Sequence, residues 1–266
     1  MMMIVQSKVS HGANGQRKSL PSKPAPANIR RTDKRGRPVR NIILLSIPDA
    51  EFVTVRSHLM PIDLGHADIL HEPGEKIEYA YFLNEGMISL VVSTSGGRAC
   101  EIGIVGKEGM IAPCVAVGLK RVPFQAITQI PGQGLKIRTD VLERLMSRCP
   151  ELREQALRYV LLQGFQVAQI AACNRLHEIE QRLARWLLMC QDRVDSEVLQ
   201  LTHEFLADML GSGRPTVSLA AGGLQRAGII ENVRGTVRII NRKDLEQAAC
   251  ECYRVIQNYN GGLGLR

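Results

Sequence analysis

The sequence lacks several features that would assign it to common protein classes. It has no run of about 18–20 consecutive apolar residues, so we expect no membrane-spanning helix. The N-terminus is basic but lacks the apolar stretch followed by small residues that marks a secretory signal. Seven cysteines are scattered without a Cys-x-x-Cys pair or a recognisable Cys/His ligand spacing. These absences favour a reduced, cytoplasmic protein without a metal site.

Motifs of enzymatic chemistry are also missing. We find no phosphate-binding Walker loop and no nucleophile–base constellation, and Ser95-Gly96-Gly97 is interpreted as a turn. We therefore expect no enzymatic activity, no catalytic residues and no cofactor.

The net charge of +8 is concentrated at the N-terminus. Residues 1–40 hold ten Lys and Arg residues and one acid, Asp33, which leaves 24 basic and 25 acidic residues from position 41 onward. Proline, serine, glycine and asparagine accompany these charges, so the segment is expected to be a disordered basic tail. It is either a solvated extension or a loose contact for nucleic acid, and an over-long predicted start is a further alternative.

Residues 41–60 favour a short amphipathic helical segment, after which the pattern becomes β-like up to about Ile137. Short apolar runs alternate with turn signals about every 8–12 residues, which is typical of an antiparallel roll or barrel. The expected strands are 79–83, 87–92, 99–105 and 125–130, and the expected turns are 73–75, 84–86, 95–97, 106–109 and 131–132.

The pattern becomes helical after Thr139, and Pro150 and Gly164 are the only proline and glycine up to Arg193. An expected helix over 150–175 would be roughly 38 Å long, which is longer than one small barrel can cover. Its apolar side chains recur at spacings of three and four, so we expect a homodimer interface, with packing along its own barrel as the alternative. This stripe comprises Leu157, Leu161, Phe165, Ala168 and Ala172.

The segment from 197 to about 243 has the order strand, helix, turn, helix and hairpin. Thr202 can cap a helix that ends at Leu210, and Pro215 suits the first turn of a second helix over 214–227. Arg234-Gly235 lies between apolar runs and predicts a β-hairpin. This order is typical of a winged DNA-binding module, although such a helix pair can also serve packing alone.

The order of these parts and three motifs resemble the Crp/Fnr family of bacterial transcription regulators. The motifs are E-P-G-E at 72–75, F-L-N-E-G-M-I-S-L at 82–90 and L-T-H-E-F-L-A-D-M-L-G-S-G-R-P-T-V-S at 201–218. The resemblance implies an α+β fold with an N-terminal antiparallel, jelly-roll-like β-roll, a long dimerisation helix and a C-terminal winged helix–turn–helix. It also implies promoter DNA, a second copy of the chain and RNA polymerase as partners.

The resemblance places the DNA-reading residues on the second helix of the module, its N-terminal side and the wing. Arg214 suits a guanine edge or a phosphate. The Glu and the later Arg that are common in the family are replaced by Pro215 and Leu219, so the family's usual half-sites are not expected. For the two wing arginines, a structural role as solvated hairpin charges is the alternative. The candidate DNA-binding residues are Thr202, Gly213, Arg214, Thr216, Ser218, Arg226, Arg234 and Arg238.

Members of the family that bind cyclic AMP hold it with a G-E-L triplet and an Arg-Ser pair. These positions are occupied here by Ala112-Pro113-Cys114 and Val122-Pro123. A cyclic phosphate needs a guanidinium and further hydrogen-bond donors, so a response to cyclic AMP is not expected. Lys120 and Arg121 either favour some anion or belong to a solvated loop.

The oxygen-sensing branch of the family ligates an iron–sulfur cluster with an N-terminal run of cysteines. This chain has no cysteine before Cys100, so that cluster is not expected. Cys114 and Cys173 leave a redox role open, whereas buried, inert cysteines are the simpler interpretation. A cyclic-nucleotide- or redox-responsive regulator that uses the same β-roll remains the alternative.

The sequence thus predicts five segments: a basic tail (1–40), a β-roll sensor domain (41–148), a dimerisation helix (149–175), a winged helix–turn–helix (176–245), and a C-terminal helix and tail (246–266). The expected function is transcription regulation from an inverted-repeat operator, bound as a homodimer, with an effector other than cyclic AMP or none.

Overall fold

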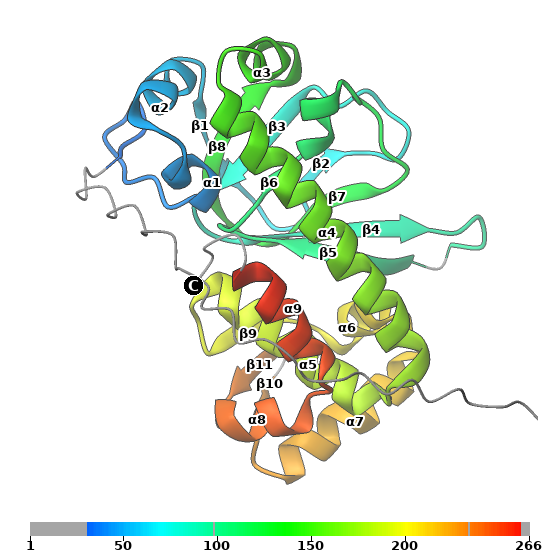
Figure 1. Cartoon of the computed structure of the whole chain (residues 1–266). Helices are drawn as coiled ribbons and strands as arrows, with labels where there is room; N and C mark the ends of the chain where they lie inside the picture. Colours follow the sequence, from blue (N-terminus) through cyan, green and yellow to red (C-terminus); the bar gives the residue numbers. More distant parts are fainter. Residues whose placement is uncertain (1–30, 98, 234, 262–266) are drawn as a thin grey trace, which may run out of the picture. The chain divides into compact units, whose positions relative to one another are not determined.

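The computed structural model describes residues 31–97, 99–233 and 235–261 (Figure 1). After two short helices, α1 (Ile42–Ser46) and α2 (Asp49–Arg56), the N-terminal half forms two four-stranded antiparallel sheets. One sheet has the strand order β1-β8-β3-β6 and the other β2-β7-β4-β5. The strands are β1 (Met60–Leu64), β2 (Ile69–His71), β3 (Tyr79–Leu83), β4 (Met87–Ser93), β5 (Ala99–Val105), β6 (Met110–Ile111), β7 (Gln125–Ile130) and β8 (Gly132–Arg138).

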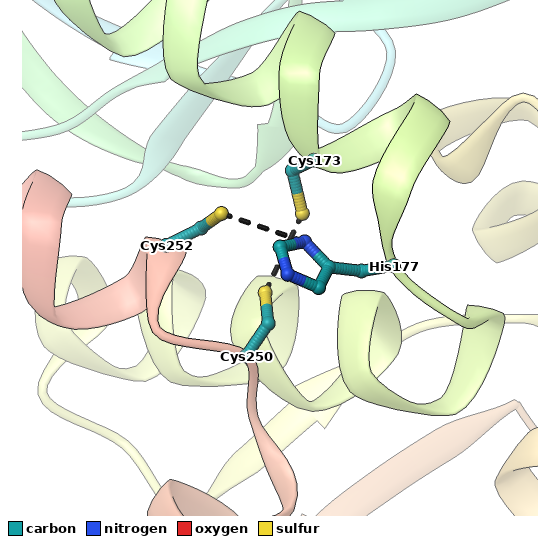
Figure 2. A group of neighbouring side chains, drawn as sticks. All are labelled: Cys173, His177, Cys250 and Cys252. Atoms are coloured by element: carbon teal, nitrogen blue, oxygen red, sulfur yellow. Dashed lines mark hydrogen bonds between the residues drawn. The ribbon is translucent and has the colours of Figure 1, made fainter. Parts of the chain in front are cut away.

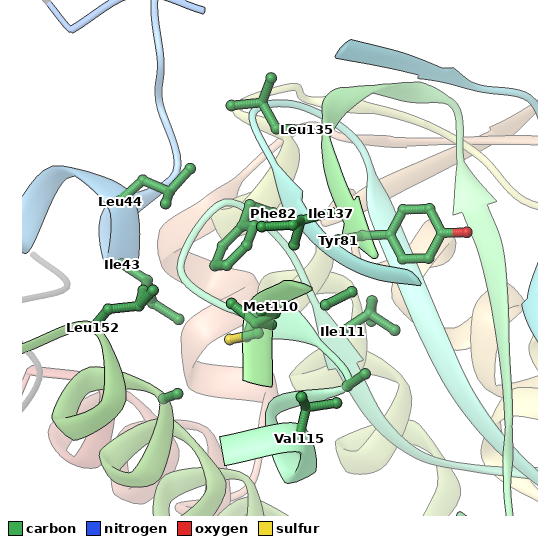
Figure 3. Packing of buried hydrophobic residues seen from close by; sticks show 14 of the residues in the cluster. Ile43, Leu44, Tyr81, Phe82, Met110, Ile111, Val115, Leu135, Ile137 and Leu152 are labelled. Carbon is green, nitrogen blue, oxygen red and sulfur yellow. The ribbon is translucent and has the colours of Figure 1, made fainter. Parts of the chain in front are cut away.

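The core of this β-roll is built from apolar side chains of the strands and of the flanking helices. Figure 3 shows Phe82 and Ile137 near Met110, with Leu44 and Leu152 contributed by helices; all five are buried in one cluster. The predicted antiparallel roll is therefore confirmed. The predicted turn at 131–132 is wrong in part, because only Pro131 separates β7 from β8, which begins at Gly132, and the chain crosses there from one sheet to the other.

The last ten residues of the predicted disordered tail are folded against the roll. Arg31 donates to the carbonyl oxygens of Leu44 (2.5 Å) and Ile47 (2.6 Å), and its guanidinium lies 4.8 Å from the centre of the Phe52 ring. The buried carboxylate of Asp33 accepts hydrogen bonds from two backbone amides of the same loop. The expectation of disorder is therefore wrong for residues 31–40, whereas residues 1–30 lie outside the described part of the chain.

Three helices follow the roll: α3 (Thr139–Met146), α4 (Pro150–Leu176) and α5 (Ile179–Val194). Helix α4 has 27 residues and is therefore about 40 Å long. Pro150 stands in its first turn, where the missing amide hydrogen costs nothing. A short 3-10 helix, η1 (Pro113–Val117), packs against α4.

The C-terminal segment contains a small three-stranded sheet and four helices. The sheet has the order β10-β11-β9 and is antiparallel. Leu206, Val217 and Leu224 of this segment are buried in one core together with Trp186 of α5. The elements are β9 (Val198–Gln200), α6 (His203–Leu210), α7 (Arg214–Arg226), β10 (Ile230–Val233), β11 (Thr236–Ile239), α8 (Arg242–Ala248) and α9 (Cys252–Gly261). Within the described ranges, no helix combines the length and the apolarity that crossing a membrane requires.

Candidate DNA-binding site

Helices α6 and α7 form the helix–turn–helix that the sequence predicts. The Oγ1 of Thr202 accepts a hydrogen bond from the amide of Phe205 (3.1 Å) and so caps the start of α6. Gly211 ends α6 with a φ of 57°, a left-handed conformation that favours glycine. Gly213 then stands at the N-cap of α7 in an extended conformation and is exposed.

Helix α7 has one buried and one exposed face. Val217, Ala220 and Leu224 fill the module core, while Arg214 and Thr216 in the first turn are exposed. The guanidinium of Arg214 lies 3.7 Å from the carboxylate of Glu204, and both side chains are largely exposed. An exposed ion pair of this length contributes little, so the Arg214 side chain is available to a ligand.

The remaining candidate residues lie in different environments. The Oγ of Ser218 is 3.0 Å from Nδ1 of His203, so this half-buried hydroxyl also connects α7 to α6. Arg226 is exposed in the last turn of α7. Arg238 pairs across the hairpin with Glu231 at 3.8 Å. Arg234, the other wing arginine, lies outside the described residues.

The comparisons with known proteins agree with this geometry. Residues 181–248 match the family model of the Crp-like helix-turn-helix domain. The transcriptional regulator SdrP of Thermus thermophilus is 26% identical over 187 residues, which cover 66% of this chain and 86% of SdrP. The global nitrogen regulator of a Synechocystis strain is 23% identical over 213 residues, covering 74% and 93% of the two chains. A solved structure described as a putative transcriptional regulator of the Crp/Fnr family from Eubacterium rectale superposes with a TM-score of 0.61 at 16% identity, covering 77% of this chain and 96% of that one.

Residues 181–248 form a Crp-like helix-turn-helix domain, and the chain as a whole has the fold of Crp/Fnr transcription regulators. It is a DNA-binding regulator, and its relatives are transcription regulators and not enzymes.

The β-roll contains a cavity of about 190 Å³. The cavity is lined by residues at both of the positions that hold the ligand in members that bind cyclic AMP: Pro113 and Cys114 at one, and Val122 at the other. Phe124 and Gln163 also line the cavity. None of the described residues in this wall carries a guanidinium or an ammonium group.

The two basic residues near that cavity are engaged elsewhere. Lys120 forms an ion pair with Glu143 at 2.5 Å, and Arg121 donates to the carbonyl oxygen of Gly74 at 2.6 Å. His71 is a polar residue that is buried in the cavity wall, and its Nδ1 has no hydrogen-bond partner among the described residues. Burial is the main cause that lowers the pKa of His71.

The apolar stripe of α4 faces solvent in the single chain. Leu161 is 62% exposed and Phe165 is 49% exposed, and Ala168 and Ala172 are exposed as well. Leu157, at the N-terminal end of the stripe, is half-buried against the roll core.

The structure also brings together four potential metal ligands that the sequence analysis missed. Cys173 and His177 at the end of α4 lie next to Cys250, in the link between α8 and α9, and Cys252, the first residue of α9. Their ligand atoms all lie within 4.8 Å of one another (Figure 2). The expectation that the chain has no Cys/His ligand arrangement is therefore wrong. The only sequence signal was the pair of short spacings, Cys-x-x-x-His and Cys-x-Cys, in segments more than 70 residues apart.

Proposed function

We propose that the regulator reads promoter DNA with the first turns of α7. The observation that carries this proposal is the division of α7 into a fully packed face and an exposed N-terminal face that presents Arg214 and Thr216. In helix–turn–helix proteins the N-terminal residues of the second helix contact base edges in the major groove. Arg214 can bind a guanine through its two donor nitrogens, and Thr216 can contact a base or a phosphate.

The other candidate residues are assigned to the DNA backbone. Thr202 and Gly213 present exposed positions at the starts of α6 and α7, and Ser218 lies one turn along α7. Arg226, Arg238 and, outside the described residues, Arg234 supply positive charge. Phosphate contacts of this kind position the protein without carrying sequence information.

We also propose that the regulator acts as a homodimer through α4. The exposed stripe of Leu161, Phe165, Ala168 and Ala172 supports this, because an apolar helix face of this length costs free energy in water. A two-fold dimer places two recognition helices about 34 Å apart, in successive major grooves. The operator is therefore expected to be an inverted repeat with half-sites about one helical turn apart.

The effector, if there is one, is expected to differ from cyclic AMP. The apolar wall of the roll cavity and the outward pairing of Lys120 and Arg121 support this, because a cyclic phosphate would lose its hydration there without gaining a cationic partner.

The division of the chain into the five predicted segments remains part of this proposal, with the tail now expected to end near residue 30. RNA polymerase is proposed as a partner and the cytoplasm as the location, both by analogy with the family.

The proposal is tested by selecting bound sites from random duplex DNA with the purified full chain. We expect an inverted repeat whose half-sites differ from the usual sites of the family, because Pro215 and Leu219 replace family base-reading residues. Recovery of DNA without any shared sequence would contradict the assignment of α7.

A further inference from the structure

Four side chains from two distant segments converge at the C-terminal end of α4. Cys173 and His177 are one helical turn apart, so both project from the same side of that end. Cys250, in the link that joins α8 to α9, and Cys252, the first residue of α9, face them (Figure 2). The Sγ atoms of Cys173 and Cys250 are 3.4 Å apart, and the Sγ of Cys252 is 3.6 Å from Nδ1 of His177.

These separations fit one tetrahedral ion. With Zn–S bonds of about 2.3 Å and Zn–N bonds of about 2.0–2.1 Å, neighbouring sulfur atoms lie about 3.8 Å apart, and a sulfur and a nitrogen about 3.5 Å apart. The sulfur–nitrogen distance in the structure agrees with this geometry, and the sulfur–sulfur distance is shorter by a few tenths of an ångström. A multi-iron cluster would spread its ligands further, because they are distributed over two or more iron atoms.

The surroundings of the four side chains are those of metal ligands. Cys173, Cys250 and Cys252 are buried and form a small cluster of their own, apart from the two main apolar cores. Nε2 of His177 lies 3.1 Å from the carboxylate of Glu251. A ligating histidine commonly donates its other ring N–H to a carboxylate, and this bond would leave the lone pair of Nδ1 directed at the sulfur atoms.

We propose that Cys173, His177, Cys250 and Cys252 bind a structural zinc ion, with Glu251 as a positioning residue for His177. The set of three cysteines and one histidine is a common closed zinc site. The thiols lose their protons to solvent when the metal binds, and no oxidation is involved.

The position of the ion gives it a role in this regulator. Helices α5 to α8, which include the whole helix–turn–helix, lie between His177 and Cys250. The ion joins the two ends of this module, and it holds the start of α9 against the end of α4. Removal of the metal is therefore expected to loosen α9 and to lower the thermal stability of the C-terminal module.

The first test is the metal content of the full chain, prepared under reducing conditions, loaded with Zn²⁺ and desalted. We expect about one zinc per chain, and we expect a chelator to make three further thiols reactive toward a thiol reagent, in addition to those that react before it is added. Loading with Co²⁺ instead is expected to give the intense visible absorption of a tetrahedral cobalt thiolate.

Single variants then test the ligands. Cys173→Ser, Cys250→Ser, Cys252→Ser and His177→Gln are each expected to lose the ion or hold it at least about tenfold more weakly, and Glu251→Gln is expected to retain it with lower affinity. Cys100→Ser and Cys114→Ser are matched controls, because these thiols lie outside the cluster and their variants are expected to keep the full zinc content.

Several results would overturn the proposal. These are a wild-type chain without zinc after loading, iron together with acid-labile sulfide, a Cys173–Cys250 disulfide in the freshly reduced protein, or full zinc content in the four ligand variants. If a ligand variant fails to fold, the protected thiols and the cobalt spectrum of the wild-type chain still decide. None of these measurements involves DNA, so they stand apart from the test of the reading helix.

Discussion

Glu101, on β5, is a carboxylic acid buried where the β-roll meets α5. Its two oxygens accept hydrogen bonds from Oγ of Ser89 and from Nε1 of Trp186, both at 2.7 Å. Burial raises the pKa of Glu101 to about 7, against an ordinary value of 4.5. The two hydrogen bonds and the positive charges of Arg185 and Arg193 act in the opposite direction and offset burial only in part.

The raised pKa makes stability depend on pH in a defined direction. Between pH 4.5 and about 7 the folded protein holds a proton on Glu101 that the unfolded chain has released. The stabilising effect of this proton is complete below the unfolded pKa and is lost as the pH rises through the folded pKa. At about 1.4 kcal/mol per pH unit, the separation of the two pKa values corresponds to about 3 kcal/mol.

The substitution Glu101→Gln removes this titration and keeps the shape of the side chain, with its amide oxygen still able to accept from Trp186. We expect urea unfolding to show that the free energy of unfolding of the variant, relative to that of the wild type, rises by about 3 kcal/mol between about pH 5 and about pH 8. Glu75→Gln, at an exposed position, is the control and is expected to follow the wild type. Parallel pH profiles for Glu101→Gln and the wild type would refute the reasoning.

Three further predictions concern the core, the dimer and the roll cavity. Gly109→Ala is expected to destabilise the roll by about 1–3 kcal/mol in chemical denaturation, because the new Cβ would lie 2.1 Å from the Tyr159 ring; an unchanged midpoint would contradict this packing. Leu161→Glu combined with Phe165→Glu is expected to convert the dimer to a monomer in sedimentation at micromolar concentration, and a wild-type chain that is already a monomer would refute the α4 interface. Calorimetry with millimolar cyclic AMP or cyclic GMP is expected to give no saturable heat, and a saturable signal would show that the cavity accepts a cyclic phosphate after all.

Local signals in the sequence were sufficient to predict the order of the helices and strands. The cap at Thr202, the glycine at 211 and the hairpin around Gly235 each depend on residues close in the chain, and α6, α7, β10 and β11 follow them within one or two residues. The strands 79–83 and 99–105 were likewise predictable from apolar runs between turns.

Features that depend on tertiary contacts were not predictable. The four potential metal ligands meet only because α9 packs against α4. The sequence spacing of Cys173 and Cys250 does not predict this packing. Residues 31–40 resemble a charged linker in composition, yet Arg31 is held by carbonyl oxygens that only the folded α1 segment presents.

The central claim is that the exposed N-terminal face of α7 reads the DNA sequence, and one measurement tests it most directly. Binding sites are selected from random duplex DNA with the full wild-type chain, with an Arg214→Ala, Thr216→Ala double variant, and with Arg254→Ala as a control that removes one exposed arginine from α9. All three proteins keep the basic residues 1–30, so unspecific binding through that segment is common to them.

We expect the control to select the same inverted repeat as the wild type, and the double variant to lose preference at the positions that α7 contacts, with about 1–3 kcal/mol less discrimination for Arg214 at a guanine. If the double variant selects the same sites with the same preference as the wild type, α7 is not the reading helix and the functional account is wrong.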